Sequence, residues 1–499
     1  MNRRRCGFVR GAVAATLVVA CAGPVYAQQP ARDPAAAERE YRVARRLAAE
    51  GSPEAAAALA RVVSLDPAGP WADDALVEQA LLEGLPGWPE ALGAIPEEAI
   101  RRAIVPLERV VSALPASDRA PEARYRTALA KLEPLAGRDP VKARAELLAL
   151  ASTGAEGAWT LASRYALGWL DEQDGAHERA YGAYLRLLVD HPGTEAAAKA
   201  AQGAGRVAMR RGQFGPAAAL LQEAVDATGS SAPEAAPLRD AAVRNLRRSA
   251  FAVTRWPATT PTKWNSAIKG ALAAVALPGG EVLVADRRAG AIVRFDRSGR
   301  ESARIALDEL EALAVDPFGR AWVAAGERIY VLRGDQPVPV ASQGAFAPAG
   351  ALAVDAAGRI YLTDRRGDRV ARVQPGAPSP ELLRERRGAA IAALAWSGGR
   401  LLALEERTGR VLDVRPDGTD EVVGTVAASS TPSLSVDAAG QIAVLDARAG
   451  AIVLLGVDGQ PKDRLVLEAA GVGRVAALTF GPDGALDVVD AAGVVTRFP

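Results

Sequence analysis

The sequence predicts a multidomain protein in which an all-α N-terminal half precedes an all-β C-terminal half. From Asp33 to about Arg248, apolar residues recur every three to four positions among Ala, Leu, Glu and Arg, the period of amphipathic helices. From Ala271 to Pro499, they form short β-rich runs between turns. A chain of 499 residues is also too long for one core, so we expect two or three domains.

The C-terminal half repeats one pattern six times. Each copy has an apolar run, a turn that ends in glycine, a second apolar run and a third. The turn glycines are 39, 39, 41, 41 and 44 residues apart: Gly280, Gly319, Gly358, Gly399, Gly440 and Gly484. Five copies continue into a weaker fourth run, such as Glu421 to Val426. Four strands in about 40 residues is the size of one propeller blade, so residues 271–499 are predicted to form a six-bladed β-propeller.

A carboxylate recurs at one position of this repeat. The sixth residue after each turn glycine is acidic in five of the six copies: Asp286, Ala325, Asp364, Glu405, Asp446 and Asp490. An aspartate also opens several turns, as at Asp316, Asp355 and Asp437. Such acids commonly accept hydrogen bonds from the adjacent turn, whereas a ring of acids on one rim would hold a cation. Because the acid recurs at one phase of the repeat, we favour the structural interpretation and expect no metal, catalytic or cofactor-binding site here.

The sixth copy stops at Pro499 without its fourth strand. An open ring would leave unpaired backbone groups at its seam. We therefore predict that a strand within residues 249–269 completes the last blade beside Val494 to Phe498. Residues 254–270 are rich in proline and β-branched residues and are predicted to link the two halves.

In several copies the second apolar run ends in an aspartate and charged residues follow. Ile360 to Val370 and Val282 to Ile292 show this most clearly. These segments resemble the NHL family of β-propellers. The resemblance implies the propeller fold more than a function. It also brings to mind propeller enzymes, such as amidating lyases and streptogramin lyases, whose metal or acid/base sites carry histidine.

Gly and Pro interrupt the helical half every 12 to 20 residues, which predicts short helices paired as antiparallel hairpins. The clearest pair runs from Leu161 to Thr194, with Gly168 where two helices cross closely and Ala180 and Tyr184 on the second helix. A second copy lies 37 residues later, with four apolar or small residues in the matching places: Gly205, Ala217, Leu221 and Ala224.

This spacing resembles the tetratricopeptide repeat, in which hairpins stack into a solenoid with a concave groove. A third, weaker copy ends at Pro67. Residues 84–140 fit the repeat poorly, and their prolines suggest an irregular insertion or degenerate hairpins. We assign residues 28–253 to this helical domain.

Residues 1–27 look like a signal peptide, because four arginines precede a short apolar stretch and a Val25-Tyr26-Ala27 cleavage site. The segment ending at Cys21 also resembles a bacterial lipoprotein box. Cleavage after Ala27 is favoured, which predicts a periplasmic protein. The alternative is an outer-membrane lipoprotein anchored through Cys21.

The residue types exclude several chemistries. Cys6 and Cys21 both lie in the leader, so the mature chain offers neither a disulfide nor a thiol nucleophile. The only histidines, His177 and His191, fall in the helical half, which excludes a His-dependent site in the propeller. Both sit at helix ends, where solvated or capping residues are expected. A net charge of +1 does not give the basic excess that nucleic-acid binding needs.

Three local motifs are explained by loops. Gly471 to Ala476 mimics a dinucleotide-binding fingerprint, but it lies between two blades and no helix pattern follows it. Arg366-Gly367-Asp368 spells an integrin-type tripeptide and is interpreted as a charged interblade turn. The basic run from Arg384 to Arg387 and the pair Arg365-Arg366 are interpreted as solvated loop charge, with an acidic partner as the alternative.

The favoured function is a non-catalytic scaffold of the cell envelope that binds proteins or peptides through a helical groove and a propeller face. One alternative is a lactonase or lyase type of enzyme that uses calcium held by carboxylates in the propeller channel. It would need three or four unlike acid or amide ligands near the axis. Another alternative is a sensor of a small envelope ligand.

Overall fold

The computed structural model describes residues 32–133, 139–154, 156–227, 235–251, 261–264, 267–375, 377, 379–415, 417, 419–427 and 433–498. The predicted leader with Cys21 and most of the predicted linker lie outside this part of the chain. The chain divides into two compact units, Met1–Ala72 and Asp73–Pro499. The later helices and the propeller therefore belong to one unit. None of the described helices is both long and apolar enough to cross a membrane.

The first unit contains α1 (Pro34–Ala49) and α2 (Ala55–Leu65). Asp33 begins α1 as its N-cap, and its carboxylate accepts a hydrogen bond of 2.8 Å from the Ala36 amide. The two helices pack through small and aliphatic side chains such as Ala44 and Leu59, both fully buried.

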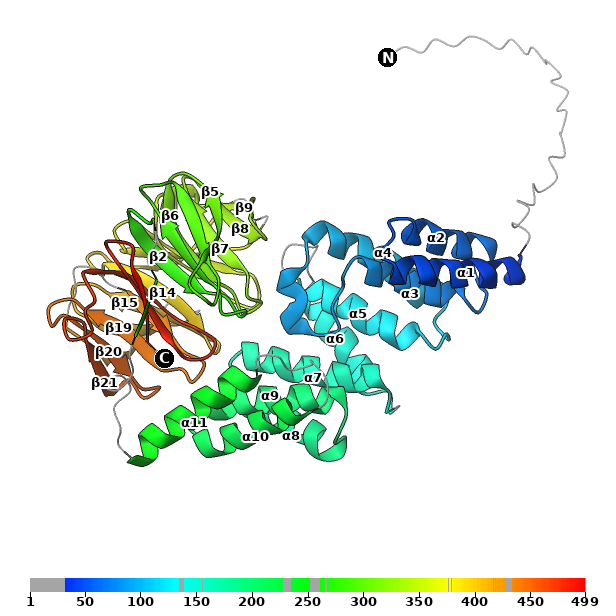
Figure 1. Ribbon diagram of the computed structural model, residues 1–499, viewed down its shortest axis with the longest axis horizontal. Coiled ribbons are helices and arrows are strands. Elements are labelled where there is room, and N and C mark those ends of the chain that lie inside the picture. Colours follow the sequence, from blue (N-terminus) through cyan, green and yellow to red (C-terminus); the bar gives the residue numbers. More distant parts are fainter. Residues whose placement is uncertain are drawn as a thin grey trace, which may run out of the picture. The chain divides into compact units, whose positions relative to one another are not determined.

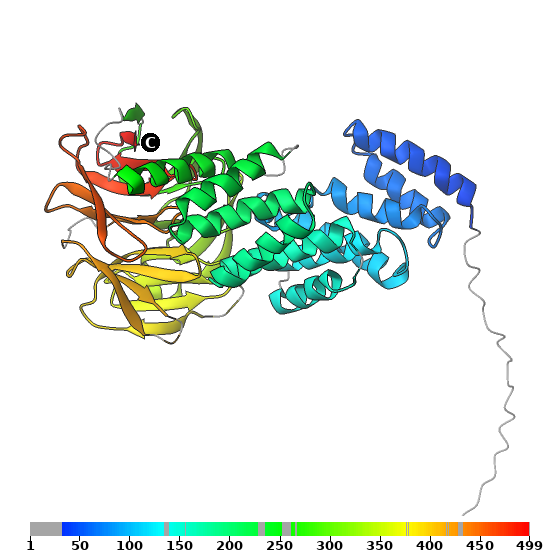
Figure 2. The same ribbon diagram turned by 90° about the horizontal axis from the view of Figure 1, so that it is seen from below.

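The second unit begins with helices that pack in sequence, each against the next from α4 to α11 (Figure 2). They are α3 (Ala72–Leu82), η1 (Pro89–Ala94), α4 (Glu97–Ala113), α5 (Ala120–Leu132), α6 (Pro140–Ala151), α7 (Ala158–Gln173), α8 (His177–Asp190), α9 (Glu195–Arg210), α10 (Phe214–Asp226) and α11 (Ala235–Phe251).

The two predicted hairpins are present as α7–α8 and α9–α10. Glycine lets the helices approach: a Cβ on Gly168 would lie 2.9 Å from the ring of Tyr184, and one on Gly205 would lie 2.5 Å from the Leu221 side chain. The described residues between 84 and 133 also form helices, namely η1, α4 and α5, although α4 contains Pro106. Pro106 is only partly buried, so the carbonyl that loses its helical partner lies near the exposed side of α4.

Six four-stranded antiparallel sheets follow, one for each predicted blade (Figure 1). Blade 1 consists of β2 (Ala271–Ala276), β3 (Val282–Asp286), β4 (Ala291–Phe295) and β5 (Glu301–Ala306). Blade 2 consists of β6 (Leu310–Val315), β7 (Ala321–Ala325), β8 (Arg328–Arg333) and β9 (Gln336–Ser342). Blade 3 consists of β10 (Ala349–Val354), β11 (Ile360–Asp364), β12 (Arg369–Val373) and β13 (Glu381–Glu385). Blade 4 consists of β14 (Ile391–Ser397), β15 (Arg400–Glu405), β16 (Arg410–Val414) and β17 (Asp420–Thr425). Blade 5 consists of β18 (Leu434–Val436), β19 (Ile442–Asp446), β20 (Ala451–Leu455) and β21 (Pro461–Val466). Blade 6 consists of β22 (Val475–Phe480), β23 (Leu486–Asp490), β24 (Val495–Phe498) and β1 (Thr262–Trp264).

The first strand of each blade contacts the first strands of both neighbouring blades, which closes the ring around these six inner strands. Buried aliphatic side chains of adjacent blades fill the space between the sheets. The six predicted turn glycines all have positive φ, between 65° and 81°, the left-handed region that glycine enters without strain. The six-bladed fold class is thus confirmed.

The predicted ring closure is also confirmed. β1 pairs antiparallel with β24, with Lys263 opposite Thr496, and becomes the outer strand of the last blade. Trp264 secures this strand. Its side chain is 5% exposed, and its ring centre lies 6.2 Å from that of Phe295 in blade 1. The guanidinium carbon of Arg497 lies over the same ring, 5.9 Å from its centre.

We expect Trp264→Ala to lower the free energy of unfolding by about 3–5 kcal/mol, because it empties a buried aromatic site at the ring seam. Urea unfolding followed by circular dichroism measures the change. Trp264→Phe, which refills most of the volume, should recover more than half of the loss. Equal stability of the alanine variant and the native protein would contradict this account of closure.

Candidate functional site

The propeller has two different faces. The turns between the first and second strands of each blade, which carry the predicted glycines, all lie on one face, here called the turn face. Since each second strand runs back from this turn, the acids at its end lie on the opposite face, here called the acid face. The two faces meet different surroundings.

The turn face contacts helices of the same unit at blades 2, 4, 5 and 6. In blade 2, the Phe318 ring lies 5.2 Å from Trp169 of α7. In blade 5, Ala439 is buried in one apolar cluster with residues of α9, α10 and α11. In blade 6, the carbonyl of Asp483 accepts a hydrogen bond from Arg244 of α11. We call these contacts, together with those of blade 4 below, the helix–propeller joint.

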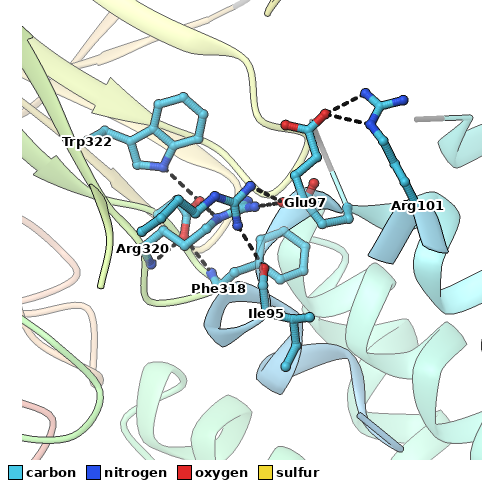
Figure 3. A network of polar contacts seen from close by, with 9 residues as sticks. Ile95, Glu97, Arg101, Phe318, Arg320 and Trp322 are labelled. Atoms are coloured by element: carbon cyan, nitrogen blue, oxygen red, sulfur yellow. Dashed lines mark hydrogen bonds and ion pairs between the residues drawn. The ribbon is translucent and has the colours of Figure 1, made fainter. Parts of the chain in front are cut away.

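Buried charges form the centre of this joint (Figure 3). Arg320 of blade 2 pairs with Glu133 at the end of α5, and their side chains are 1% and 0% exposed. Arg320 also donates to Asp316 at 2.7 Å. Arg333 of β8 donates to the carbonyl of Ile95 at 2.9 Å and lies 3.6 Å from Glu133. Two propeller arginines therefore hold one helical carboxylate and one helical carbonyl away from water.

Asp316 is buried and accepts several hydrogen bonds. It accepts hydrogen bonds from Trp322 Nε1 at 2.8 Å, from the guanidinium of Arg320 and from the Phe318 and Arg320 amides. Burial raises the pKa of Asp316 to about 7, against these donors, which favour the ionised form. The predicted turn-capping function is present, and the same carboxylate also orients Arg320 toward the helices.

Blade 4 meets the helices at a close contact between two turns. A Cβ on Gly175, between α7 and α8, would lie 3.0 Å from the carbonyl oxygen of Gly398, and one on Gly399 would lie 2.5 Å from the Gly175 Cα. Both Gly175 and Gly399 have positive φ. Two turns therefore meet closely because neither carries a side chain at the contact.

His177, the first residue of α8, lies beside this contact against Gly398. Burial, together with the nearby Arg210 of α9, lowers the pKa of His177. Glu172 of α7 and the Gly398 backbone favour the charged form, and Arg400 of blade 4 opposes it. His177 was expected to be a solvated or capping residue; it is half-buried at the joint because blade 4 covers it. His191 ends α8 as its C-cap, with its Nε2 3.0 Å from Arg164.

The recurring acids of the acid face satisfy backbone amides. Asp286 accepts from the Lys269 amide at 2.9 Å, Asp446 from Ala449 at 2.9 Å, and Asp490 from Val494 at 2.9 Å. Asp364 and Glu405 bind Arg369 and Arg410 of their own blades. Each of these acids therefore holds a neighbouring turn or strand, as the structural interpretation predicted.

The inner strands carry mostly small or apolar residues where they reach the acid face. A register shift marks this point in five blades, and the residues within it are Leu272, Glu311, Gly350, Ala351, Ala392 and Ala476. Glu311 is the ionisable member of this set. It accepts hydrogen bonds from Gln343 Nε2 at 2.8 Å and from the Ala349 amide at 2.9 Å, and burial raises its pKa.

Calcium in proteins takes roughly six to eight oxygen ligands, and the inner ends of these five blades supply one carboxylate, which already holds the connection between blades 2 and 3. Within the described ranges, the structure holds no group of three His, Cys, Asp or Glu side chains that could bind a metal ion.

Two of the cavities on the second unit bear on its function. The first, of about 590 Å³, lies between α7 and α8, and its lining includes Gly168, Gly182, Arg164, Arg186 and Asp190. The second, of about 540 Å³, opens on the acid face of blade 3 and is lined by Ala345, Ala347, Asp364, Arg365, Arg366, Asp368, Arg369, Glu385 and Arg387. The sequence indicated Arg365, Arg366 and Arg387 as loop charge, and Gly168 of the first cavity as a packing position.

One of the three local motifs lies where expected, and two need correction. Arg384, the first residue of the basic run that was predicted as solvated loop charge, is buried in β13 and pairs with Asp420 at 2.8 Å. Gly471 to Ala476 begins in the connection from blade 5 to blade 6 and enters β22, so a strand follows it and not a helix. Arg366-Gly367-Asp368 lies within blade 3, between β11 and β12, and not between blades. The interblade prediction was wrong because the acid at Asp364 ends a strand that returns within its own sheet.

No protein-family model matches the chain, and no curated protein matches it either. Solved propeller structures are similar over about half of its length. A streptogramin B lyase is 15% identical, with 48% of this chain and 96% of that chain covered and a TM-score of 0.38. Regucalcin, a calcium-binding protein from Agrobacterium tumefaciens, is 15% identical, with 47% and 90% covered and a TM-score of 0.38. A putative gluconolactonase is 17% identical, with 50% and 94% covered and a TM-score of 0.39. At these values the likeness carries no argument about the activity of this chain.

Removing Glu133 should weaken the joint strongly. We expect Glu133→Ala to lower the free energy of unfolding by about 3–5 kcal/mol, because it removes one of the two carboxylates, Glu133 and Asp316, that neutralise the buried Arg320 and Arg333 beside it. The matched control is Glu301→Ala, which breaks a 2.9 Å pair with Arg304 that is about one-third exposed and should cost less than about 1 kcal/mol. Urea unfolding of both variants measures the difference. Similar losses in the two variants would contradict a central function for the buried pair.

The joint should also make stability depend on pH through His177. Since the folded pKa of His177 is lowered, the unfolded chain binds the proton more tightly, and stability falls as pH drops below about 6.5. His177→Gln removes this titration, so between about pH 7.5 and pH 5 the variant should lose less stability than the native protein. Urea unfolding at both pH values tests this. Parallel pH profiles for variant and native protein would refute it.

Proposed function

We propose that this protein is a non-catalytic scaffold that binds other proteins through a helical groove and through the acid face of its propeller. The observation that carries the proposal is the asymmetry of the propeller. Its turn face packs against helices of its own unit at four blades. Its acid face carries a cavity and exposed arginines instead.

The joint supports a scaffold because it couples the two cavities mechanically. The α7–α8 cavity and the blade 3 cavity belong to one compact unit. Buried charge pairs and close glycine contacts restrict motion between the helices and the blades, because even a small displacement would break them. Two partners, or two parts of one partner, would then be held at a fixed separation.

The likeness of the helical hairpins to tetratricopeptide repeats, and of the blades to NHL repeats, supports the same function. Stacked helical hairpins and propellers commonly bind peptides and proteins through their concave or loop-bearing surfaces. The leader at residues 1–27 supports a site of action in the periplasm, with attachment to the outer membrane through Cys21 as the second route.

The lactonase or lyase type of function has less support. Its calcium would need several unlike oxygen ligands at the acid-face end of the channel, where the described inner strands supply Glu311 beside aliphatic residues and glycine. The sensor of a small envelope ligand would use the same two cavities as the scaffold, with a smaller occupant.

Affinity capture from a cell-envelope extract tests the proposal. The full chain serves as bait beside two surface variants, Ala183→Trp in the α7–α8 cavity and Arg366→Glu on the acid face. We expect the native protein to capture a defined partner that at least one variant loses, because each change blocks one surface without touching the joint. Recovery of no partner, or of the same proteins by all three baits, would overturn the proposal.

Metal analysis of the same purified protein separates the scaffold from the calcium enzyme. Calcium at about one equivalent, retained after dialysis, would favour the enzyme, because a carboxylate cage of the lactonase type binds its ion stably. The scaffold predicts calcium at background level together with partner capture.

A further inference from the structure

The cavity on the acid face is built by blade 3 and by the two connections that join it to blades 2 and 4. Ala345 and Ala347 come from the connection between blades 2 and 3, Arg365 and Arg366 from the turn between β11 and β12, and Arg387 from the connection to blade 4. Its volume of about 540 Å³ falls within the range of roughly 300–1,000 Å³ that is usual for ligand sites.

The floor of this cavity is fixed by internal contacts. Arg369 donates to Asp364 at 3.0 Å and to the carbonyl of Ala345 at 3.0 Å, and its guanidinium lies 4.6 Å from the centre of the buried Phe346 ring. Asp368 accepts a hydrogen bond of 2.7 Å from the Gly388 amide. Two of the three lining acids and one of the four lining arginines are therefore occupied in holding the loops.

The remaining ionisable groups are Arg365, Arg366, Arg387 and Glu385, all exposed. None of the four has a hydrogen bond or ion pair from its side chain to the part of the chain that the structure describes. Arginines on the adjacent strands differ: Arg372 pairs with Glu381 at 2.7 Å, and Arg384 with Asp420 at 2.8 Å. The cavity thus gathers three free guanidinium groups beside one free carboxylate.

This combination favours a polypeptide over a small anion. A guanidinium presents a planar fork of donors that matches a carboxylate in two parallel hydrogen bonds. Glu385 offers the opposite chemistry, because its carboxylate accepts hydrogen bonds. A peptide can donate a backbone amide to it, whereas an anion such as phosphate would be repelled. Ala345 and Ala347 add apolar lining for the aliphatic part of a side chain.

We propose that this cavity binds an acidic segment of a partner protein, with side-chain carboxylates paired to Arg365, Arg366 and Arg387 and a backbone amide donated to Glu385. The proposal rests on the proposed scaffold function and specifies the partner's chemistry. Binding of this kind weakens with added salt, since the arginines are exposed to solvent.

Fluorescence anisotropy with the full-length protein tests it. The probe is a labelled octapeptide of alternating glutamate and alanine. The test variant is Arg365→Gln/Arg366→Gln/Arg387→Gln. The matched control is Arg109→Gln/Arg124→Gln/Arg247→Gln, which removes three exposed arginines without ion-pair partners among the described residues of α4, α5 and α11.

We expect the cavity variant to bind the probe about tenfold more weakly than the native protein, and the control variant to bind within about twofold of it. A variant with lysine at all three cavity positions, Arg365→Lys/Arg366→Lys/Arg387→Lys, keeps the positive charge but loses the paired donors of the guanidinium. It should bind the probe with intermediate affinity. Circular dichroism should show native thermal unfolding for all three variants, because the changed side chains are exposed.

Other outcomes would overturn the proposal. Equal weakening by the cavity and control variants would show attraction to overall charge only. Tighter, cavity-dependent binding of inorganic phosphate or of a sulfated polysaccharide would assign the cavity to a different ligand. If the octapeptide does not bind, but the cavity variant still captures the partner of the native protein, the scaffold function stands and the acidic-segment proposal falls.

Discussion

The buried pair between Arg320 and Glu133 is the interaction on which the second unit depends. Both side chains are almost completely withdrawn from water, so the loss of either one leaves a buried charge that is less well neutralised. Because one partner lies in a blade and the other follows α5, the pair penalises any separation of the helices from the propeller. Asp316 and Trp322 orient Arg320, and thus make a turn of blade 2 part of the contact.

The blades show how one repeat can supply different functions at its two ends. At the turn face, glycines keep the loops compact, and at Gly399 the absent side chain admits a helical turn. At the acid face, the recurring carboxylates hold the loops through backbone amides. The side chains of the loop residues that directly follow these carboxylates are not needed for those amide contacts, so their charge can differ from blade to blade. Blade 3 has arginines there, and blade 6 has alanines at positions 491 and 492.

Much of the fold could be predicted because it is encoded locally. The repeat phase placed Asp286, Asp364 and Asp490 at strand ends, and the missing fourth strand required one from before Ala271. The joint could not be predicted in the same way. Arg320, Arg333 and Glu133 belong to residue types that usually face solvent, and they lie about 190 residues apart across the two halves. A single sequence carries no signal that pairs such distant positions.

The candidate site was anticipated only in composition. The basic residues around Arg366 and Arg387 were noticed as charge, but their convergence depends on three loops that meet around Phe346 and Arg369. His177 was placed at a helix start, and its burial arises from Gly398 of blade 4. Loops brought together by tertiary packing leave no periodic pattern in the chain.

The pairing of β1 with β24 has a consequence for biosynthesis. One strand of the last blade, β1, precedes the other five blades in the chain, and its partner β24 (Val495–Phe498) follows them. The ring therefore cannot be completed until Val495–Phe498 have been synthesised. Until then, Thr262–Trp264 has no neighbour, while the helices before it have already emerged and can fold. A chain that ended before Val495 would leave two unsatisfied edges, one on β23 and one on β1, and such edges promote aggregation.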